Sequence, residues 1–230
     1  MRLLSSASGK VAGSPVHHPV FARFYARVSV NAETRLGMAG VRDRLLAGLS
    51  GRVIEIGAGN GLNFAHYPGA VAEVVAIEPE PLLRQLARKA ALRAQVPVDV
   101  VPGAAEALPV KSEAFDAAVL SLVLCSVRDV ARALAEVRRV LRPGGEVRFV
   151  EHGRGGGRVM TLTQRALDRT VWPALMGGCH VAREPVAALR EAGFELGPVR
   201  PLLLPEKGPR LPTSYGVLGV AWRPGEPEAR

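Results

Sequence analysis

The sequence has few cysteines, few aromatic side chains and no long apolar run, and each shortage excludes a class of protein. Two cysteines in 230 residues do not make a disulfide framework, and neither stands at a metal-ligand spacing from a histidine, so we expect no metal site. An aromatic content of 5% provides few stacking platforms for single-stranded nucleic acid. No apolar stretch approaches the roughly 18–20 residues of a membrane-spanning helix, and the first residues lack the apolar core of a secretory signal. We therefore expect a cytoplasmic protein.

Positive charge, by contrast, is abundant. The formal net charge is +9 and the sequence pI is about 10.5, a balance that suits nucleic acid or an anionic membrane surface. No block of five like charges occurs, and the richness in Ala, Gly, Pro, Arg and Val is typical of GC-rich coding sequence. We therefore disfavour nucleic acid as a partner and leave peripheral membrane contact open. The sequence does not indicate an oligomeric state.

The length and composition suit one globular domain. With 48% hydrophobic and 22% charged residues, the chain can build a complete core. Residues 1–18, rich in Ser, Gly, Ala and Pro, are expected to form a flexible arm before a single domain over 19–225. Two helices at 20–30 and 41–49 are expected to open that domain.

From residue 52 onward, short apolar runs alternate with helical segments. Strands are expected at 52–56, 73–78, 98–101, 114–121, 146–151, 194–200 and 215–222, and helical segments at 81–94, 130–141, 160–175 and 183–192. The central strands are almost wholly apolar, as strands buried on both faces of a parallel sheet are. This βαβ rhythm predicts an α/β, Rossmann-like fold with a mainly parallel sheet covered by helices on both faces.

A glycine loop follows the first expected strand, with the sequence Gly57-Ala58-Gly59-Asn60-Gly61. Gly57 and Gly59 allow the backbone to approach a ligand where a Cβ would collide. A helix after the loop would present free N–H groups. Nicotinamide, flavin and adenosylmethionine domains all use loops of this kind, and a tight turn without a ligand is the alternative.

Glu78 ends the second expected strand, about 20 residues beyond the glycine loop. A carboxylate in this place accepts hydrogen bonds from both ribose hydroxyls of an adenosine. Alone, Glu78 could be an ordinary surface residue. Together, the loop and the carboxylate predict an adenosine-containing cofactor without choosing which one.

Further motifs choose the cofactor. Gly103-Ala104-Ala105-Glu106-Ala107-Leu108-Pro109 follows the third expected strand, Phe115-Asp116 opens the fourth, and Leu141-Arg142-Pro143-Gly144-Gly145 precedes the fifth. With these motifs the chain resembles the class I S-adenosylmethionine-dependent methyltransferases of the type 11 group, over about residues 20–225. The resemblance implies an enzyme (EC 2.1.1) with the seven-stranded class I fold. It also implies S-adenosyl-L-methionine as cofactor and S-adenosyl-L-homocysteine as product.

The resemblance also assigns roles to residues. The glycine loop and Glu55 would face the methionine end, the backbone of Ala105 the adenine, and Tyr25 would be part of a lid, although helix packing explains Tyr25 equally well. Many relatives have Asp where this chain has Ala104, so adenine recognition would depend on backbone groups. The cofactor-binding residues expected are Tyr25, Glu55, Gly57, Ala58, Gly59, Glu78, Pro79, Ala105, Glu106, and, beneath the sulfonium, Ser121 and Leu122.

A closer resemblance concerns the acceptor. Similarity to the membrane-associated thiol S-methyltransferases is found in the segments 121–127, Glu151-His152, Gly177-Gly178-Cys179-His180 and Asn63-Phe64. We do not expect their N-terminal hydrophobic anchor in this chain. The general pattern is also similar to bacterial phospholipid N-methyltransferases. The resemblance implies lid helices at 19–50, a cofactor half at 51–153 and an acceptor half at 154–225. A small-molecule acceptor is expected: a small thiol, or, by N- or O-methylation, a lipid headgroup or a secondary metabolite. Whether S, N or O is methylated stays open.

Methyl transfer is a direct displacement in which the acceptor lies in line with the departing sulfur. His152, just past a strand end, is the candidate catalytic base, with a locally bonded structural histidine as the alternative. His180 is a weaker candidate, and Cys125 and Cys179 are expected to line the pocket or the core. A non-catalytic adenosylmethionine-binding protein is the competing class. A methyltransferase acting on amino groups of bases is disfavoured because the segment 121–124 lacks an Asn/Asp-Pro-Pro-aromatic motif.

Overall fold

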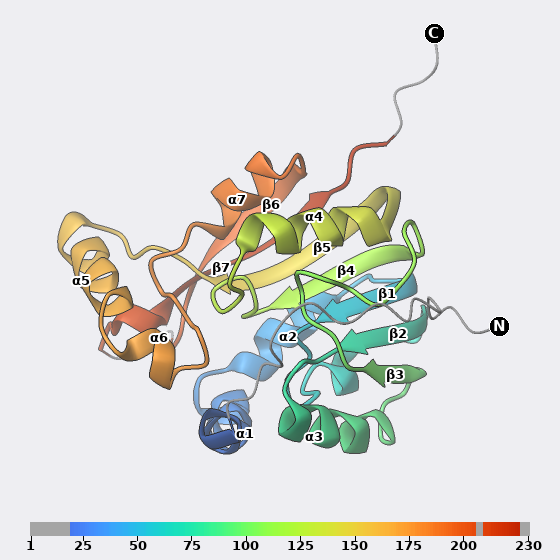
Figure 1. Cartoon of the computed structure of the whole chain (residues 1–230), viewed down its shortest axis with the longest axis horizontal. Coiled ribbons are helices and arrows are strands. Elements are labelled where there is room, and N and C mark those ends of the chain that lie inside the picture. The colour runs from blue at the N-terminus through green and yellow to red at the C-terminus, as the bar shows by residue number, and fades with distance from the viewer. Residues whose placement is uncertain (1–18, 206–208, 226–230) are drawn as a thin grey trace, which may run out of the picture.

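A computed structural model of the chain describes residues 19–205 and 209–225, and a seven-stranded sheet runs through its centre (Figure 1). The strand order is β3-β2-β1-β4-β5-β7-β6. Neighbouring strands from β3 to β5 pair in parallel, and β7 is antiparallel to both β5 and β6. The strands are β1 (Gly51–Ile56), β2 (Val71–Ile77), β3 (Val98–Val101), β4 (Phe115–Ser121), β5 (Leu141–His152), β6 (Glu195–Leu203) and β7 (Tyr215–Trp222). The predicted class I Rossmann-like fold is confirmed, while the arm predicted at 1–18 lies outside the described residues.

Helices cover both faces of the sheet. Helices α1, α2 and α3 pack together on one face, and α4 and α7 lie together on the other (Figure 1). Along β4, Ala117 and Val119 belong to the core under α2 and α3, whereas Ala118 and Leu120 pack with α4. The helices are α1 (Pro19–Arg35), α2 (Met38–Leu46), α3 (Pro81–Ala91), α4 (Val130–Val140), α5 (Arg158–Asp168), α6 (Trp172–Leu175) and α7 (Pro185–Glu191), with 3-10 turns η1 (Phe64–His66) and η2 (Pro212–Ser214). No helix in the described ranges is long and apolar enough to cross a bilayer.

Three predicted helical segments differ from the structure. The amphipathic segment predicted at 160–175 is divided into α5 and α6, because Pro173 is tolerated in the first turn of a helix but not in its interior. The second helix spans Met38–Leu46 rather than 41–49, and β1 already begins at Gly51 rather than at 52. The last helix begins at Pro185, again because proline favours a first turn.

The prediction of a helix directly after the glycine loop is wrong. Only the 3-10 turn η1 (Phe64–His66) follows the loop. Gly61 has a φ of +81°, and Pro68 disfavours a helical conformation for the residue before it, so the segment between them is less than two helical turns long. A row of free helical N–H groups is therefore not formed there.

Candidate active site

The predicted site residues meet at the carboxyl edge of the parallel strands. The glycine loop follows β1, Glu78 follows β2, Ser121 ends β4 and His152 ends β5. In open α/β sheets, ligands bind at this edge. A small hollow opens there, and its lining residues are Tyr25, Arg42, Glu55, Gly57, Ala58, Asn60, Leu62, Asn63 and Ser121.

The glycine loop is held close against its neighbours. Gly57 has a φ of +68°, and a Cβ on it would lie 2.6 Å from Cγ2 of Val123. Gly59 has a φ of +57°, and a Cβ there would lie 3.3 Å from the ring of Tyr25. The N–H groups of Gly57 and Ala58 both donate to the carbonyl of Ile77, at 2.8 and 3.1 Å. The loop is thus fastened to the end of β2, where only small residues fit.

Glu78 lies directly beneath this loop. One of its carboxylate oxygens accepts the N–H of Gly59 at 2.7 Å, and the other accepts the N–H of Glu80 at 2.8 Å. Burial raises the pKa of Glu78 to about 7, against the lowering effect of these hydrogen bonds. Each carboxylate oxygen has a second lone pair, so the group can accept further hydrogen bonds from a ligand.

Glu55 is the second buried carboxylate of the site. It accepts hydrogen bonds from Asn63 Nδ2 at 2.9 Å and from the Tyr67 hydroxyl at 2.7 Å. Burial raises the pKa of Glu55 to about 7, although both hydrogen bonds and the nearby Arg42 guanidinium oppose the rise. Glu55 thus lines the hollow, and its hydrogen bonds and the Arg42 charge offset only part of the cost of burying its negative charge.

We expect Glu55→Gln to change how stability depends on pH. The pKa of Glu55 rises from 4.5 when unfolded to about 7 when folded, so wild-type stability falls as pH rises from 4.5 to 7. Glutamine does not ionise, so the unfolding free energy of the variant relative to wild type should increase by about 3 kcal/mol between pH 4.5 and 7.5. Urea unfolding at a series of pH values measures this difference. The exposed Glu195→Gln is the control, and parallel curves for wild type and Glu55→Gln would contradict the pKa shift.

Arg42 of α2, which was not among the predicted site residues, joins α1 to the site. Its guanidinium pairs with Glu33 at 3.0 Å, donates to Asn63 Oδ1 at 2.6 Å and lies 3.5 Å from the Ser121 hydroxyl. Arg42 lies on the buried face of α2 beside Val41. A charged residue at helical spacing among apolar residues was the signal that could have revealed it.

Tyr25 of α1 lies over Gly59, with its ring 3.3 Å from the position a Cβ would take. Its ring also stacks at a tilt on Phe21, with centroids 5.6 Å apart. Burial raises the pKa of Tyr25, and the Glu78 carboxylate adds to the rise while Arg42 opposes it. Tyr25 thus packs against Phe21 of its own helix and also lies over the glycine loop, and its role as a lid stays a prediction.

The residues predicted to contact the adenine lie in a turn after β3. Ala105 is half-buried in the turn after β3, where the N–H of Ala107 donates to the carbonyl of Ala104. The Glu106 carboxylate accepts the N–H of Arg128 at 2.9 Å, so it fastens this turn to the start of α4. In this structure the Glu106 side chain has a structural partner.

The predicted acceptor side brings together residues that are far apart in the sequence. Leu122 has a φ of +58°, and its carbonyl lies 3.4 Å from Cys125 Sγ. The Cys179 thiol lies 3.5 Å from His152 Nδ1. A hydrogen bond with Cys179, together with burial, raises the pKa of the Cys125 thiol well above its usual value. Burial lowers the pKa of His152, but the hydrogen bond with Cys125 and nearby negative charge outweigh it, so the net shift is upward.

The other candidate base, His180, is engaged locally. Its Nδ1 lies 2.7 Å from the carbonyl of Gly178, and its backbone N–H donates to the carbonyl of Cys125 at 2.8 Å. Both contacts fix the conformation of the loop after α6. His180 therefore fits a structural function.

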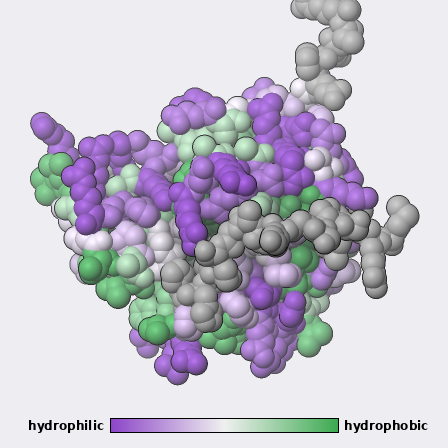
Figure 2. Space-filling model, in the orientation of Figure 1, coloured by the Kyte–Doolittle hydropathy of each residue, from purple (hydrophilic) through white to green (hydrophobic). Residues whose placement is uncertain are grey.

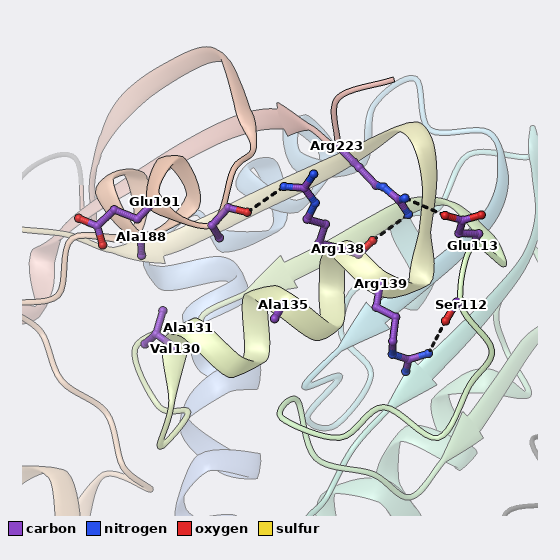
Figure 3. Close-up of a pocket in the computed structure, with 11 residues that line it drawn as sticks. Ser112, Glu113, Val130, Ala131, Ala135, Arg138, Arg139, Ala188, Glu191 and Arg223 are labelled. Atoms are coloured by element: carbon purple, nitrogen blue, oxygen red, sulfur yellow. Dashed lines mark hydrogen bonds and ion pairs between the residues drawn. The ribbon is translucent and has the colours of Figure 1, made fainter. Parts of the chain in front are cut away.

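A wider surface groove lies away from this edge, between α4 and α7 (Figure 3). It has a volume of about 770 Å³ and is lined by Ala131, Ala135 and Ala188, with arginines at one end. Arg223 pairs with Glu113 across that end at 2.7 Å. None of the predicted cofactor residues lines the groove, so we do not assign the methyl-transfer chemistry to it.

The strand order and the helices on both faces are those of the class I methyltransferase fold, and comparisons with known proteins agree with it. The family described as a methyltransferase domain matches residues 54–149. Human thiol S-methyltransferase TMT1A is 37% identical over 156 residues, covering 64% of this chain and 62% of that protein. The ubiquinone/menaquinone biosynthesis C-methyltransferase of Syntrophotalea carbinolica is 30% identical, covering 65% of this chain and 64% of that protein.

Solved structures give the same result. A SAM-dependent methyltransferase of Thermotoga maritima is 26% identical, with a TM-score of 0.64, and the match covers 89% of this chain and 98% of that chain. The chain has the class I methyltransferase fold, and its residues 54–149 match the methyltransferase family that the sequence motifs predicted. It spans less than two-thirds of the length of the two curated relatives named above.

Proposed function

We propose that the protein transfers the methyl group of S-adenosylmethionine to a small thiol by direct in-line displacement. One observation carries the proposal: the glycine loop with Glu78 and the Cys125–His152–Cys179 side chains share one edge of the sheet. The first group suits an adenosine cofactor, and the second places two buried thiols and an imidazole where we propose that the acceptor binds. The similarity to thiol S-methyltransferases favours the same acceptor class.

The cofactor half of the proposal uses residues 51–153, covered by lid helices at 19–50. Glu78, followed by Pro79, would hold the ribose, and Glu55 with the Gly57–Ala58–Gly59 segment would face the methionine end. Tyr25 would close over the cofactor. Ala105 and Glu106 would meet the adenine side through their backbone, while Ser121 and Leu122 would form the floor beneath the sulfonium.

Chemistry in this site needs positioning more than acid catalysis. The attacking sulfur must lie about 3 Å from the methyl carbon and in line with the departing sulfur. The sulfonium becomes neutral as the bond breaks, so the leaving group needs no proton. The acceptor thiol must lose its proton, and its usual pKa near 8.5 makes that loss partial at neutral pH. We propose that residues 154–225 together with His152 form the acceptor half, where this ionisation is promoted.

A lipid headgroup is the second candidate acceptor, and the surface supports it. Exposed apolar side chains gather on α1, α5 and α6, at the left and lower left of the face in Figure 2. Among them are Val20 and Val159, each 80% exposed, and Leu175, 66% exposed. Arginines such as Arg23 and Arg158 lie among them. Apolar side chains flanked by positive charge suit peripheral contact with an anionic bilayer.

One assay separates these functions. We expect the purified protein to form S-adenosylhomocysteine with a small alkyl thiol, and the rate to rise with pH through the thiol pKa, because the thiolate is the nucleophile. A parallel reaction contains phosphatidylethanolamine vesicles in place of the thiol. Turnover with vesicles alone would move the assignment to lipid headgroups. Cofactor binding without product in either reaction would favour a non-catalytic binding protein.

A further inference from the structure

Three side chains with soft or borderline metal-ligand atoms converge at the acceptor edge. Cys125 comes from the loop after β4, His152 ends β5, and Cys179 lies in the loop after α6. One ligand atom from each lies within 4.8 Å of those of the other two. They include both cysteines of the chain. Because the three residues come from separate segments, no spacing in the sequence could indicate this cluster.

The separation of the Cys179 and His152 ligand atoms suits a tetrahedral zinc site. Zinc lies about 2.3 Å from thiolate sulfur and about 2.0–2.1 Å from imidazole nitrogen, so tetrahedral geometry separates those two ligand atoms by about 3.6 Å. The Cys179 Sγ to His152 Nδ1 distance is 3.5 Å. Two cysteines and one histidine are also a ligand set of catalytic zinc sites, which keep the fourth position open.

The loops that carry the cysteines are held in place without a metal. The buried Glu151 carboxylate accepts the N–H groups of Val123, Leu124 and Cys125, at 2.8, 2.9 and 3.3 Å. The Asp168 carboxylate accepts N–H groups from the two residues that follow His180, at 2.8 and 3.0 Å. Such outer contacts orient metal ligands and reduce the ordering that binding requires.

We propose that Cys125, His152 and Cys179 form a binding site for one Zn²⁺ ion, with the fourth position available to the acceptor thiol. The acceptor role rests on the proposed function, whereas the metal site does not. The thiol coordinates and releases its proton to solvent. The coordinated thiolate then forms the new S–C bond, and the C–S bond of the sulfonium breaks with its electron pair remaining on the sulfur of S-adenosylhomocysteine. In this scheme His152 acts as a ligand rather than as a proton acceptor.

The position of the cluster supports that role. Cys125 Sγ lies 3.4 Å from the carbonyl of Leu122, and the side chain of Leu122 packs against the cluster. Leu122 is also the residue proposed for the floor beneath the sulfonium. A thiolate held by the cluster would therefore be next to the cofactor side of the edge.

The test measures metal binding without reference to activity. The metal-free, reduced full chain is titrated with Co²⁺, whose thiolate charge-transfer absorption reports cysteine ligation, and then with Zn²⁺ as competitor. We expect one equivalent to bind. Cys125→Ser and Cys179→Ser should each lower the affinity by more than the ~10–100-fold that the loss of an outer-shell partner costs. His66→Gln, on η1 and paired with Asp43 at 2.7 Å, is the control histidine and should bind as wild type does.

The outcomes are distinct. No thiolate absorption, or equal affinities for wild type and both serine variants, would overturn the site and leave a cluster of hydrogen-bonded thiols. A Cys125–Cys179 disulfide that resists reduction would overturn it as well. Thiol turnover by the metal-free chain, unchanged on adding zinc, would overturn the acceptor role while the proposed function stands. Zinc binding without any thiol turnover would contradict the proposed function but would still support the metal site. His152→Ala, checked for folding by circular dichroism, should weaken Co²⁺ binding as the serine variants do.

Discussion

Glu78→Ala should raise the dissociation constant for S-adenosylmethionine on the order of 100-fold or more. In the proposed complex the Glu78 carboxylate accepts hydrogen bonds from the two ribose hydroxyls. Each hydrogen bond to a charged group contributes about 1.5–3 kcal/mol of binding free energy. The variant also removes the acceptor for the N–H of Gly59, which lies 2.7 Å away, and thereby loosens the glycine loop. Isothermal titration calorimetry with the cofactor measures the change directly.

A matched control tests whether position or charge decides this effect. Glu73 lies on the same strand, β2, but pairs with Arg52 at 2.5 Å, and its side chain is 40% exposed. Glu73→Ala removes the same charge and should leave the cofactor affinity unchanged. Glu78→Gln should be intermediate, because its amide oxygen accepts while its amide nitrogen faces a backbone donor. An unaltered affinity in Glu78→Ala would remove Glu78 from the ribose role.

Gly57→Ala should destabilise the fold and nearly abolish cofactor binding. A non-glycine residue in the left-handed region costs about 1–2 kcal/mol, and Gly57 has a φ of +68°. The added Cβ would also lie 2.6 Å from Val123 Cγ2, which adds about 1–3 kcal/mol of overpacking. Any shift that relieves this contact displaces the loop proposed to face the methionine end. Chemical denaturation and the same calorimetry measure both effects.

The variant Gly48→Ala distinguishes the backbone cost from the steric cost. It has a φ of +77°, and a Cβ on it would meet nothing within 4 Å. Gly48→Ala therefore carries only the backbone cost of about 1–2 kcal/mol and should bind the cofactor as wild type does. The double variant Gly57→Ala, Val123→Ala should recover part of the steric loss. Equal destabilisation by Gly48→Ala and Gly57→Ala would show that the contact with Val123 has no effect.

Local sequence patterns predict which edge of the sheet holds the proposed cofactor site. A continuous apolar strand, then glycines at 57, 59 and 61, then a carboxylate at the end of the next strand specify both the elements and their polarity. Parallel strands bring their carboxyl ends to one edge, so Glu78 and the loop had to meet there. Chain-local patterns therefore sufficed for the class I fold and for the positions proposed to bind the cofactor.

The ends of the helices were harder to predict from the sequence, because apolar periodicity and the backbone restriction of proline compete there. Pro173 divides a segment whose apolar periodicity is continuous, and Pro68 cuts short the helix expected after Gly61. In both cases the periodicity of the side chains was visible, but the backbone restriction of proline decided where the helix could run.

The sequence by itself determined the seven-stranded fold, the resemblance to methyltransferases and the pairing of the glycine loop with Glu78. Only the tertiary structure decided that Arg42 joins α1 to Asn63 and that Cys125, His152 and Cys179 lie together. The physical reason is the distance along the chain over which each effect acts. Periodicity and turn chemistry act over a few residues, whereas these contacts depend on how whole elements pack across the sheet, and that packing places side chains from distant segments within bonding distance.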